Sequence, residues 1–181
     1  MTKKLKFGLD FHGVINDAPE FFRDFADAAM GHGYEVYVIS GGSTQKLEKY
    51  LNEWDIKYTG TFSLVDYFKK AGKIKFFDNG DFSVSDELWD TAKAKFCKKN
   101  KINLQIDDTI RYKQHFSTPF AFYDAKNKTC DLDGKIVDLS SPASRVLSEF
   151  EKILKSGSEI TQVNRLNHKE HGRNNSYKNL R

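Results

Sequence analysis

The alternation of short apolar runs with amphipathic stretches constrains the fold of this chain more than any other feature. Between residues 5 and 124, runs typical of strands are separated by stretches whose apolar residues recur at helical spacing. Such alternation is typical of α/β proteins with a central, mostly parallel sheet. We therefore predict a Rossmann-like, three-layer α/β fold. The predicted strands are 5–11, 35–40, 56–60, 102–106 and 118–123, and the predicted helices begin near 17, 43, 63, 85 and 141.

The charge distribution separates a neutral body from a basic end. The chain has 181 residues, which fits one domain, and we assign that domain to residues 1–164. Residues 165–181 carry five Lys or Arg residues against one acid, so they account for the whole net charge of +4. We predict that this polar tail is mobile. Because the body is neutral overall, its net charge does not indicate nucleic-acid binding.

Composition excludes several classes of protein. Aromatic residues make up 14% of the chain, which argues against intrinsic disorder. No apolar run approaches the ~18 residues of a membrane-spanning helix, and no apolar signal core follows the first lysines. The two cysteines, Cys97 and Cys130, are too few for a disulfide framework and fit a reducing compartment. We therefore expect a cytoplasmic protein without a membrane partner.

Two polar segments follow predicted strands directly. In Asp10–Val14, Asp10 ends an apolar strand, Gly13 permits a sharp turn, and His12 lies on the same side as Asp10 if the chain stays extended. In Ser40–Ser43, hydroxyl groups, backbone N–H groups and a helix N-terminus can together hold a phosphate. The alternative for this second segment is a turn followed by an ordinary helix cap. Ligand sites in open α/β sheets form where strands end in this way.

Lys93 and an acidic pair supply further charged groups. Lys93 falls within an apolar helical stripe, so it should pair with a buried anion, unless its ammonium extends to solvent. Asp107 and Asp108 follow a predicted strand, and adjacent carboxylates repel each other unless a cation offsets their charge. Mg²⁺ suits such oxygen ligands. A solvated turn is the alternative for this pair.

The order of these features resembles the haloacid dehalogenase (HAD) superfamily of phosphatases and phosphotransferases. Asp10–Ile15 is similar to the first motif of that family, Asp-x-Asp-Gly-x-x, and the strand ending in Ser40 is similar to the second. Lys93 matches the third motif, a helical lysine, and the acidic pair matches the fourth, a strand ending in acids. The resemblance covers residues 5–124. Response-regulator receiver domains use similar parts, but in them the acid pair comes first in the chain.

The resemblance implies a HAD-like fold and a phosphoaspartate mechanism. In that mechanism Asp10 attacks phosphorus, and Lys93 neutralises charge on the transferring group. Ser40 and the neighbouring N–H groups, beginning at Gly41, orient the phosphate. The implied activity is Mg²⁺-dependent phosphomonoester hydrolysis, with a nucleotide or a nucleic-acid end as the leading substrate class. The implied cofactor is Mg²⁺, and its ligands would be Asp10, the backbone carbonyl of His12, and Asp107 or Asp108.

His12 departs from the family pattern, because the family's phosphatases usually have an acid/base Asp at this position. Imidazole has an ordinary pKa of about 6.5 and can exchange protons near neutral pH, so we interpret His12 as a substitute acid/base. Two alternatives remain open: a binding module that keeps the fold without turnover, and a phosphotransferase. A further interpretation is that His12 binds a softer metal together with the acids, but a single histidine gives it little support.

Segment 61–84 is less regular than its neighbours and includes a predicted hairpin with its turn at Asn79–Gly80. It is either a small lid or a structural crossover. One helix and a turn fill the thirty residues between Asp10 and Ser40, so we predict a minimal cap and an open site. We expect the segment's aromatic residues to pack in the core, with stacking on a nucleobase as the alternative. These residues are Phe62, Tyr67, Phe68, Phe76, Phe77 and Phe82.

Overall fold

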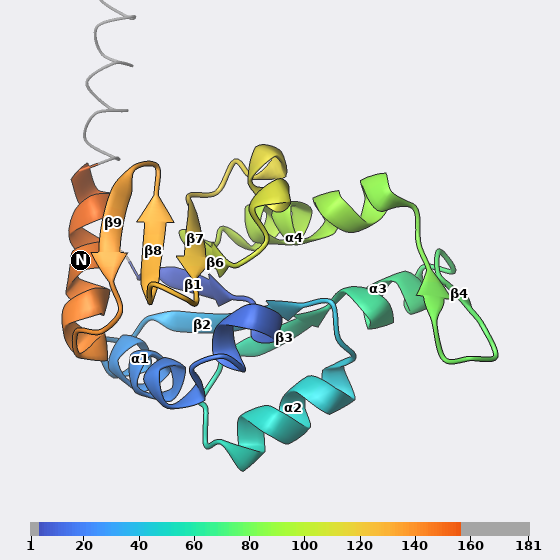
Figure 1. Cartoon of the computed structure of the whole chain (residues 1–181), viewed down its shortest axis with the longest axis horizontal. Coiled ribbons are helices and arrows are strands. Elements are labelled where there is room, and N and C mark those ends of the chain that lie inside the picture. The colour runs from blue at the N-terminus through green and yellow to red at the C-terminus, as the bar shows by residue number, and fades with distance from the viewer. Residues whose placement is uncertain (1–3, 157–181) are drawn as a thin grey trace, which may run out of the picture. The chain divides into compact units, whose positions relative to one another are not determined.

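The structure is a computed structural model that describes residues 4–156 (Figure 1). The chain divides into two compact units, residues 1–147 and 148–181. Within the described range, all strands belong to the first unit, and residues 148–156 of the second are helical. The basic tail predicted for 165–181 lies outside the described residues, and the domain boundary at 164 stays a prediction.

A seven-stranded sheet forms the centre of the first unit, in the order β3-β2-β1-β6-β7-β8-β9. The strands from β3 to β7 in this order run parallel, and β8 and β9 continue the sheet in antiparallel pairing. The predicted α/β class with a mostly parallel sheet is therefore confirmed. The strands are β1 (Lys6–Leu9), β2 (Glu35–Ser40), β3 (Gly60–Ser63), β6 (Leu104–Asp107), β7 (Phe120–Asp124), β8 (Thr129–Leu132) and β9 (Lys135–Asp138).

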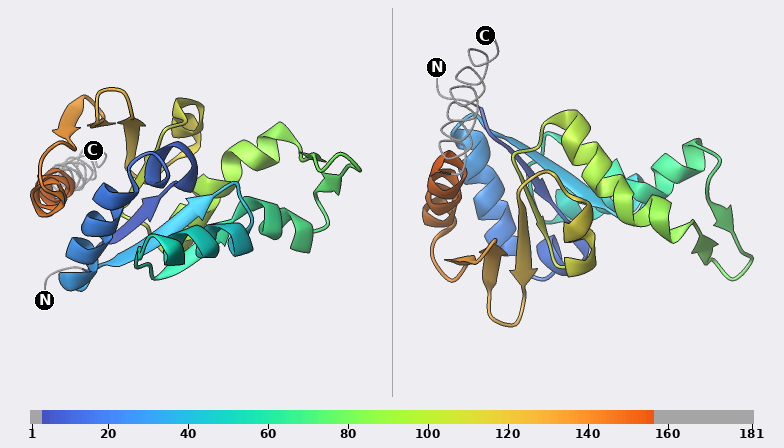
Figure 2. Two further views of the ribbon diagram at one scale, coloured as in Figure 1. Left: turned by 60° about the horizontal axis from the view of Figure 1, so that its bottom comes forward. Right: turned by 90° about the horizontal axis from the view of Figure 1, so that it is seen from above.

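Helices cover both faces of this sheet (Figure 2). On one face, the ring of Phe7 packs against Phe25 of α1 (Pro19–Gly31), with ring centroids 5.4 Å apart. Phe7 pairs with Val36 in the register, so Tyr37 points to the opposite face. There Tyr37 packs against Phe96 of α4 (Asp86–Asn100). The two helices thus lie on opposite sides of the sheet, which confirms the three layers.

The third strand begins later than predicted. We expected it over 56–60, whereas β3 spans Gly60–Ser63. The amide of Ile56 donates to the carbonyl of Leu51, and Asp55 has φ of 52°, so these residues end α2 (Thr44–Glu53) instead of extending as a strand. The error arose because an apolar residue that closes a helix resembles the start of a short strand.

The less regular segment forms a helix and a hairpin. The helix α3 (Leu64–Lys70) follows β3 directly, and β4 (Lys75–Phe76) pairs antiparallel with β5 (Phe82–Ser83). Gly80 has φ of 88°, so a glycine suits the predicted turn between them. Figures 1 and 2 show this hairpin projecting beyond α3 and α4, away from the seven-stranded sheet. Its function as a lid stays a prediction.

Two short segments complete the connections that matter for the site, and in the first of them His12 and Gly13 have non-helical backbone angles. The segment η1 (Phe11–Ile15) follows β1, and η2 (Ile110–His115) follows β6. The predicted hairpin around Asp133–Gly134 is present as β8 and β9.

Across residues 4–156, no helix combines the length and apolar character needed to cross a membrane.

Candidate functional site

Two buried carboxylates lie side by side at the carboxyl ends of the central strands. Leu9 of β1 pairs with Ile106 of β6, and the next residues are Asp10 and Asp107. The amide of Asp10 also donates to the carbonyl of Ile106 at 2.9 Å, so pairing continues to the strand end. Asp10 is 4% exposed and Asp107 is fully buried. Two acids removed from water in this way need a compensating positive charge.

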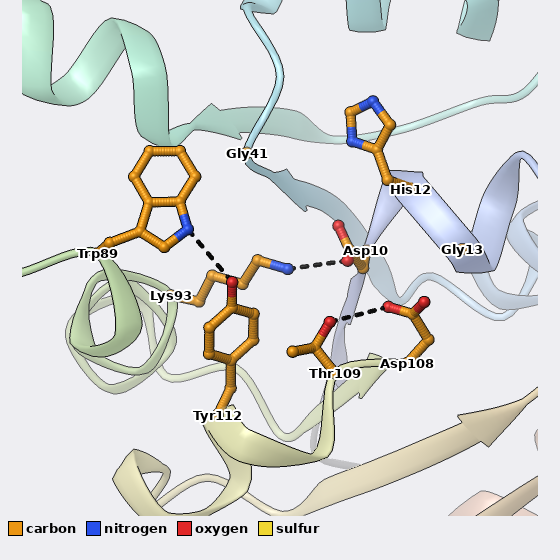
Figure 3. Close-up of a pocket in the computed structure, with 9 residues that line it drawn as sticks. All are labelled: Asp10, His12, Gly13, Gly41, Trp89, Lys93, Asp108, Thr109 and Tyr112. Carbon is orange, nitrogen blue, oxygen red and sulfur yellow. Dashed lines mark hydrogen bonds and ion pairs between the residues drawn. The ribbon is translucent and has the colours of Figure 1, made fainter. Parts of the chain in front are cut away.

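Lys93 supplies that charge. Its ammonium nitrogen lies 2.9 Å from Oδ2 of Asp10 (Figure 3) and 2.7 Å from Oδ2 of Asp107. Lys93 is 3% exposed, so the prediction that it pairs with a buried anion is confirmed, and extension into solvent is excluded. The ring of Tyr112 lies beside the ammonium, with its centroid 5.1 Å from the nitrogen. The lysine is thus fixed between two anions and an aromatic ring.

Burial and neighbouring charges shift the pKa values of Asp10, Asp107 and Lys93 in opposite directions. Burial raises the pKa of Asp10, while the neighbouring Lys93 charge lowers it in part. The pKa of Asp107 is raised for the same reason, again against the effect of Lys93. Burial alone would lower the pKa of Lys93, but the two negative charges outweigh it and hold the ammonium protonated. The Lys93 ammonium therefore stays positively charged beside the two carboxylates. A bound metal ion would further stabilise their ionised forms.

Asp108 completes a group of acids that can hold a metal ion. One oxygen from each of Asp10, Asp107 and Asp108 lies within 4.8 Å of the others. Thr109 organises the pair, because its amide donates to Oδ1 of Asp107 and its hydroxyl to Oδ1 of Asp108. Asp107 is buried, so the solvated-turn alternative is wrong for it. An all-oxygen donor set fits a hard divalent cation such as Mg²⁺.

Gly13 gives the third acid its space. Its φ is 78°, and a Cβ atom at this position would overlap the carboxylate of Asp108. The absence of a side chain therefore lets the segment after β1 approach the acids that follow β6. This gives Gly13 a steric function in addition to the sharp turn that the sequence indicates.

His12 is held by Ser40 at the edge of this group. Nδ1 of His12 lies 3.0 Å from Oγ of Ser40, and the amide of Gly42 donates to the same oxygen at 3.4 Å. Figure 3 shows the imidazole extending from the segment after Asp10. Burial lowers the pKa of His12, and the charge of Lys93 lowers it further, against the opposing effect of Asp108.

A pocket of about 260 Å³ opens over these residues (Figure 3). Ser40 and Asp107 do not line it, since both are fully buried behind it. The pocket brings together Asp10, His12, Gly41, Lys93 and Asp108 from the predicted set. Its other lining residues are Gly13, Trp89, Thr109 and Tyr112.

Sequence reasoning missed Trp89, Thr109 and Tyr112 as site residues. Trp89 precedes Lys93 by one helical turn on α4, a spacing that places the two on one helix face. Its indole N–H donates to the hydroxyl of Tyr112 at 3.2 Å, so one pocket wall joins α4 to η2. A Cβ atom on Gly41 would lie 3.1 Å from the indole, so the loop after β2 approaches this wall closely.

The helix after that loop does not have the ordinary cap that was the alternative for this segment. The Ser43 side chain makes no capping hydrogen bond. Instead, Oδ2 of Asp66 in α3 accepts from the amide of Thr44 at 2.7 Å. The predicted phosphate-binding function of Ser40 and Gly41 stays a prediction.

Comparison of the chain with protein-family models, with curated proteins and with solved structures found no match. The site is therefore defined by its geometry. It consists of a candidate acidic metal site made by Asp10, Asp107 and Asp108, with Lys93 beside it and a pocket above it.

Proposed function

We propose that the protein is a Mg²⁺-dependent phosphomonoester hydrolase of the HAD-like type, acting through a phosphoaspartate on Asp10. One observation carries this proposal: Asp10 lines the pocket, with the Lys93 ammonium 2.9 Å from one of its oxygens and Asp107 and Asp108 within cation-binding range. Nucleophile, fixed cation and metal ligands in one pocket are the parts that phosphoryl transfer requires.

The reaction takes two displacements. In the first, a carboxylate oxygen of Asp10 attacks phosphorus, the bond from phosphorus to the ester oxygen breaks, and the departing oxygen takes a proton from His12. In the second, water gives a proton to His12 and attacks phosphorus, the bond from Asp10 to phosphorus breaks, and inorganic phosphate leaves. The amide of Phe11 donates to Oδ1 of Asp10 at 2.7 Å, which fixes the rotation of the attacking carboxylate.

Other residues hold charge during these steps. Lys93 stabilises negative charge on the transferring group, and the backbone at Gly41, which also lines the pocket, offers N–H groups to the phosphate. When bound, Mg²⁺ supplies further neutralisation of the phosphoryl oxygens. The residues that would hold it are Asp10, Asp107, Asp108 and, through its carbonyl oxygen, His12. The proposed substrates are nucleotides or phosphorylated nucleic-acid ends.

The residue type at position 12 supports one alternative. His12 contacts Ser40 through Nδ1 and stands where phosphatases of the HAD family usually have an acid/base Asp. A protein that binds phosphate without turnover would keep the Asp10–Lys93 pair and lack the acid/base function. A phosphotransferase, in which another acceptor replaces water, uses the same first displacement.

The test is hydrolysis of an aryl phosphate and of an alkyl phosphate, whose leaving group needs a proton, with and without Mg²⁺. We expect Mg²⁺-dependent activity in the wild type, loss of at least about a hundredfold in His12→Ala with substrates whose leaving group needs a proton, and abolition in Asp10→Asn. Asp24→Asn is the matched control, because Asp24 is an exposed acid on α1. Full activity in Asp10→Asn would contradict the mechanism.

A binding measurement separates a turnover-deficient protein from one with no phosphate site. Beryllofluoride mimics a phosphoryl group on a carboxylate, so with Mg²⁺ it should raise the Tm of the wild type and leave that of Asp10→Asn unchanged. A Tm shift without hydrolysis would favour the binding module. An unchanged Tm in the wild type would contradict the presence of a phosphate site.

A further inference from the structure

The hairpin beyond α3 exposes aromatic rings that the sequence led us to place in the core. Phe76, Phe77 and Phe82 are 49%, 44% and 42% exposed, respectively. Core packing holds for Phe68, which is 2% exposed, but is wrong for these three and for Tyr67 of α3, which is 51% exposed. Exposed apolar rings gathered in one short hairpin are typical of an interaction surface. Phe76 and Phe82 pair across the hairpin and share one face, whereas Phe77 follows Phe76 along the chain and points to the other face. We call Phe76 and Phe82 the aromatic strip.

The aromatic strip is continuous with the pocket wall. The ring of Phe82 lies 5.4 Å from the indole of Trp89, which lines the pocket, and Phe76 lies 6.4 Å from Phe82 on the neighbouring strand. Phe68 of α3 also stacks on Trp89, with ring centroids 6.0 Å apart, so the indole is held between packed rings. A ligand whose phosphate enters the pocket therefore meets aromatic surface directly outside it.

Lysines accompany these rings. Nζ of Lys75 lies 5.3 Å from the ring centroid of Phe77, and the exposed lysines nearby are Lys69, Lys70 and Lys73. The hairpin's acids, Asp78 and Asp81, lie in the turn, where Asp81 accepts from the side chain of Asn79. Residues 69–83 therefore carry four lysines against two acids, and exposed rings on a segment with net positive charge suit bases and backbone phosphates.

We propose that the aromatic strip binds the single-stranded end of a nucleic acid. Bases stack on Phe76 and Phe82, Lys73 and Lys75 contact backbone phosphates, and the terminal phosphate enters the pocket beside Trp89. Only the placement of the terminal phosphate rests on the proposed function, since stacking on the hairpin needs no chemistry at Asp10. The inference therefore names a substrate class and a surface that selects it.

The test is fluorescence anisotropy with a labelled oligothymidylate of about a dozen nucleotides, unphosphorylated or carrying a 5′- or 3′-phosphate. The protein is Asp10→Asn, so that the ligand is not consumed. We expect Phe76→Ala/Phe82→Ala to weaken binding of all three ligands by about tenfold or more, because base–aromatic stacking is lost. Lys73→Gln/Lys75→Gln should reduce the salt dependence of binding. Ile136→Ala is the matched control, since Ile136 is a 61% exposed apolar residue on β9.

The outcomes separate this inference from the proposed function. Binding that depends on Phe76 and Phe82 supports the inference even if no phosphatase activity is found. Binding unchanged in the double variant overturns it, even if aryl phosphates are hydrolysed. Self-association would also overturn the inference. In that case the Asp10→Asn protein binds no oligonucleotide and forms a concentration-dependent dimer in sedimentation, and the double variant does not form this dimer, so the strip is a self-association surface. Circular dichroism and Tm confirm that each variant is folded.

Discussion

The ammonium nitrogen of Lys93 lies 2.7 Å from Oδ2 of Asp107, and both side chains are almost completely removed from solvent. This pair joins α4 to the end of β6, and Asp10 joins it from β1. A buried pair of this kind has a stability effect as well as a chemical one, because removing one partner leaves an uncompensated charge in a low-dielectric environment.

Replacing that lysine should therefore destabilise the fold. We expect Lys93→Met to lower the free energy of unfolding by about 3–5 kcal/mol at neutral pH, the range for breaking a buried ion pair. Urea denaturation measures it. Lys95→Met is the matched control on α4, because the Lys95 ammonium is exposed and contacts only the Thr91 hydroxyl among the described hydrogen bonds, and its effect should stay within about 0.5 kcal/mol. Equal effects of the two variants would contradict a buried pair.

The close approach of Gly13 to Asp108 predicts a specific loss of metal binding. Mg²⁺ should raise the Tm of the wild type, and Gly13→Ala should abolish the rise, because the new methyl group displaces a metal-binding carboxylate. Gly72→Ala separates this clash from backbone strain, since Gly72 also has positive φ, of 65°, and a Cβ atom there would meet no described atom within 4 Å. That control should lose about 1 kcal/mol of stability and keep the Mg²⁺ response. A retained response in Gly13→Ala would show that Asp108 does not bind the metal.

The lowered pKa of Glu35 predicts how the stability of the protein changes in acid. Hydrogen bonds from the Tyr37 hydroxyl and the Lys6 ammonium lower the pKa of Glu35 from 4.5 to about 2. A group with a depressed pKa in the folded state contributes stability above its unfolded pKa and loses it as pH falls toward its folded pKa. The stability difference between wild type and Glu35→Gln should be constant above about pH 5.5 and shrink between pH 4.5 and 2. Urea titrations across this range measure it, and a difference that grew in acid would refute the assigned hydrogen bonds.

The cysteines should be unreactive while the protein is folded. Burial raises the pKa of Cys97 to about 12, and Cys130 is equally inaccessible. Thiolate is the reactive form, so a disulfide reagent such as Ellman's should modify neither residue at pH 8 until guanidinium unfolds the chain. Rapid modification of the native protein would mean that the packing around at least one thiol opens readily. The Cys97→Ser variant would then identify which thiol is exposed.

Strand ends and helix faces were the parts of the site that sequence could predict. Asp10 and Asp107 each follow an apolar run, and Lys93 interrupts an apolar helical stripe, so local periodicity alone marked all three. Trp89 escaped notice because a tryptophan on such a stripe resembles any core residue. Its partner Tyr112 lies 23 positions away, in a segment without regular periodicity.

The sequence by itself determined the types of element, their order and the identity of the charged groups. Period-2 and period-3.6 patterns arise from local backbone geometry, which neighbouring residues decide. Only the tertiary structure decided which groups meet: the contact of His12 with Ser40, the fit of Gly13 to Asp108, and the exposure of the aromatic strip. These depend on how strands and helices pack across long separations in the chain, which no local pattern encodes. The same residue, phenylalanine, is therefore core at position 68 and surface at position 76.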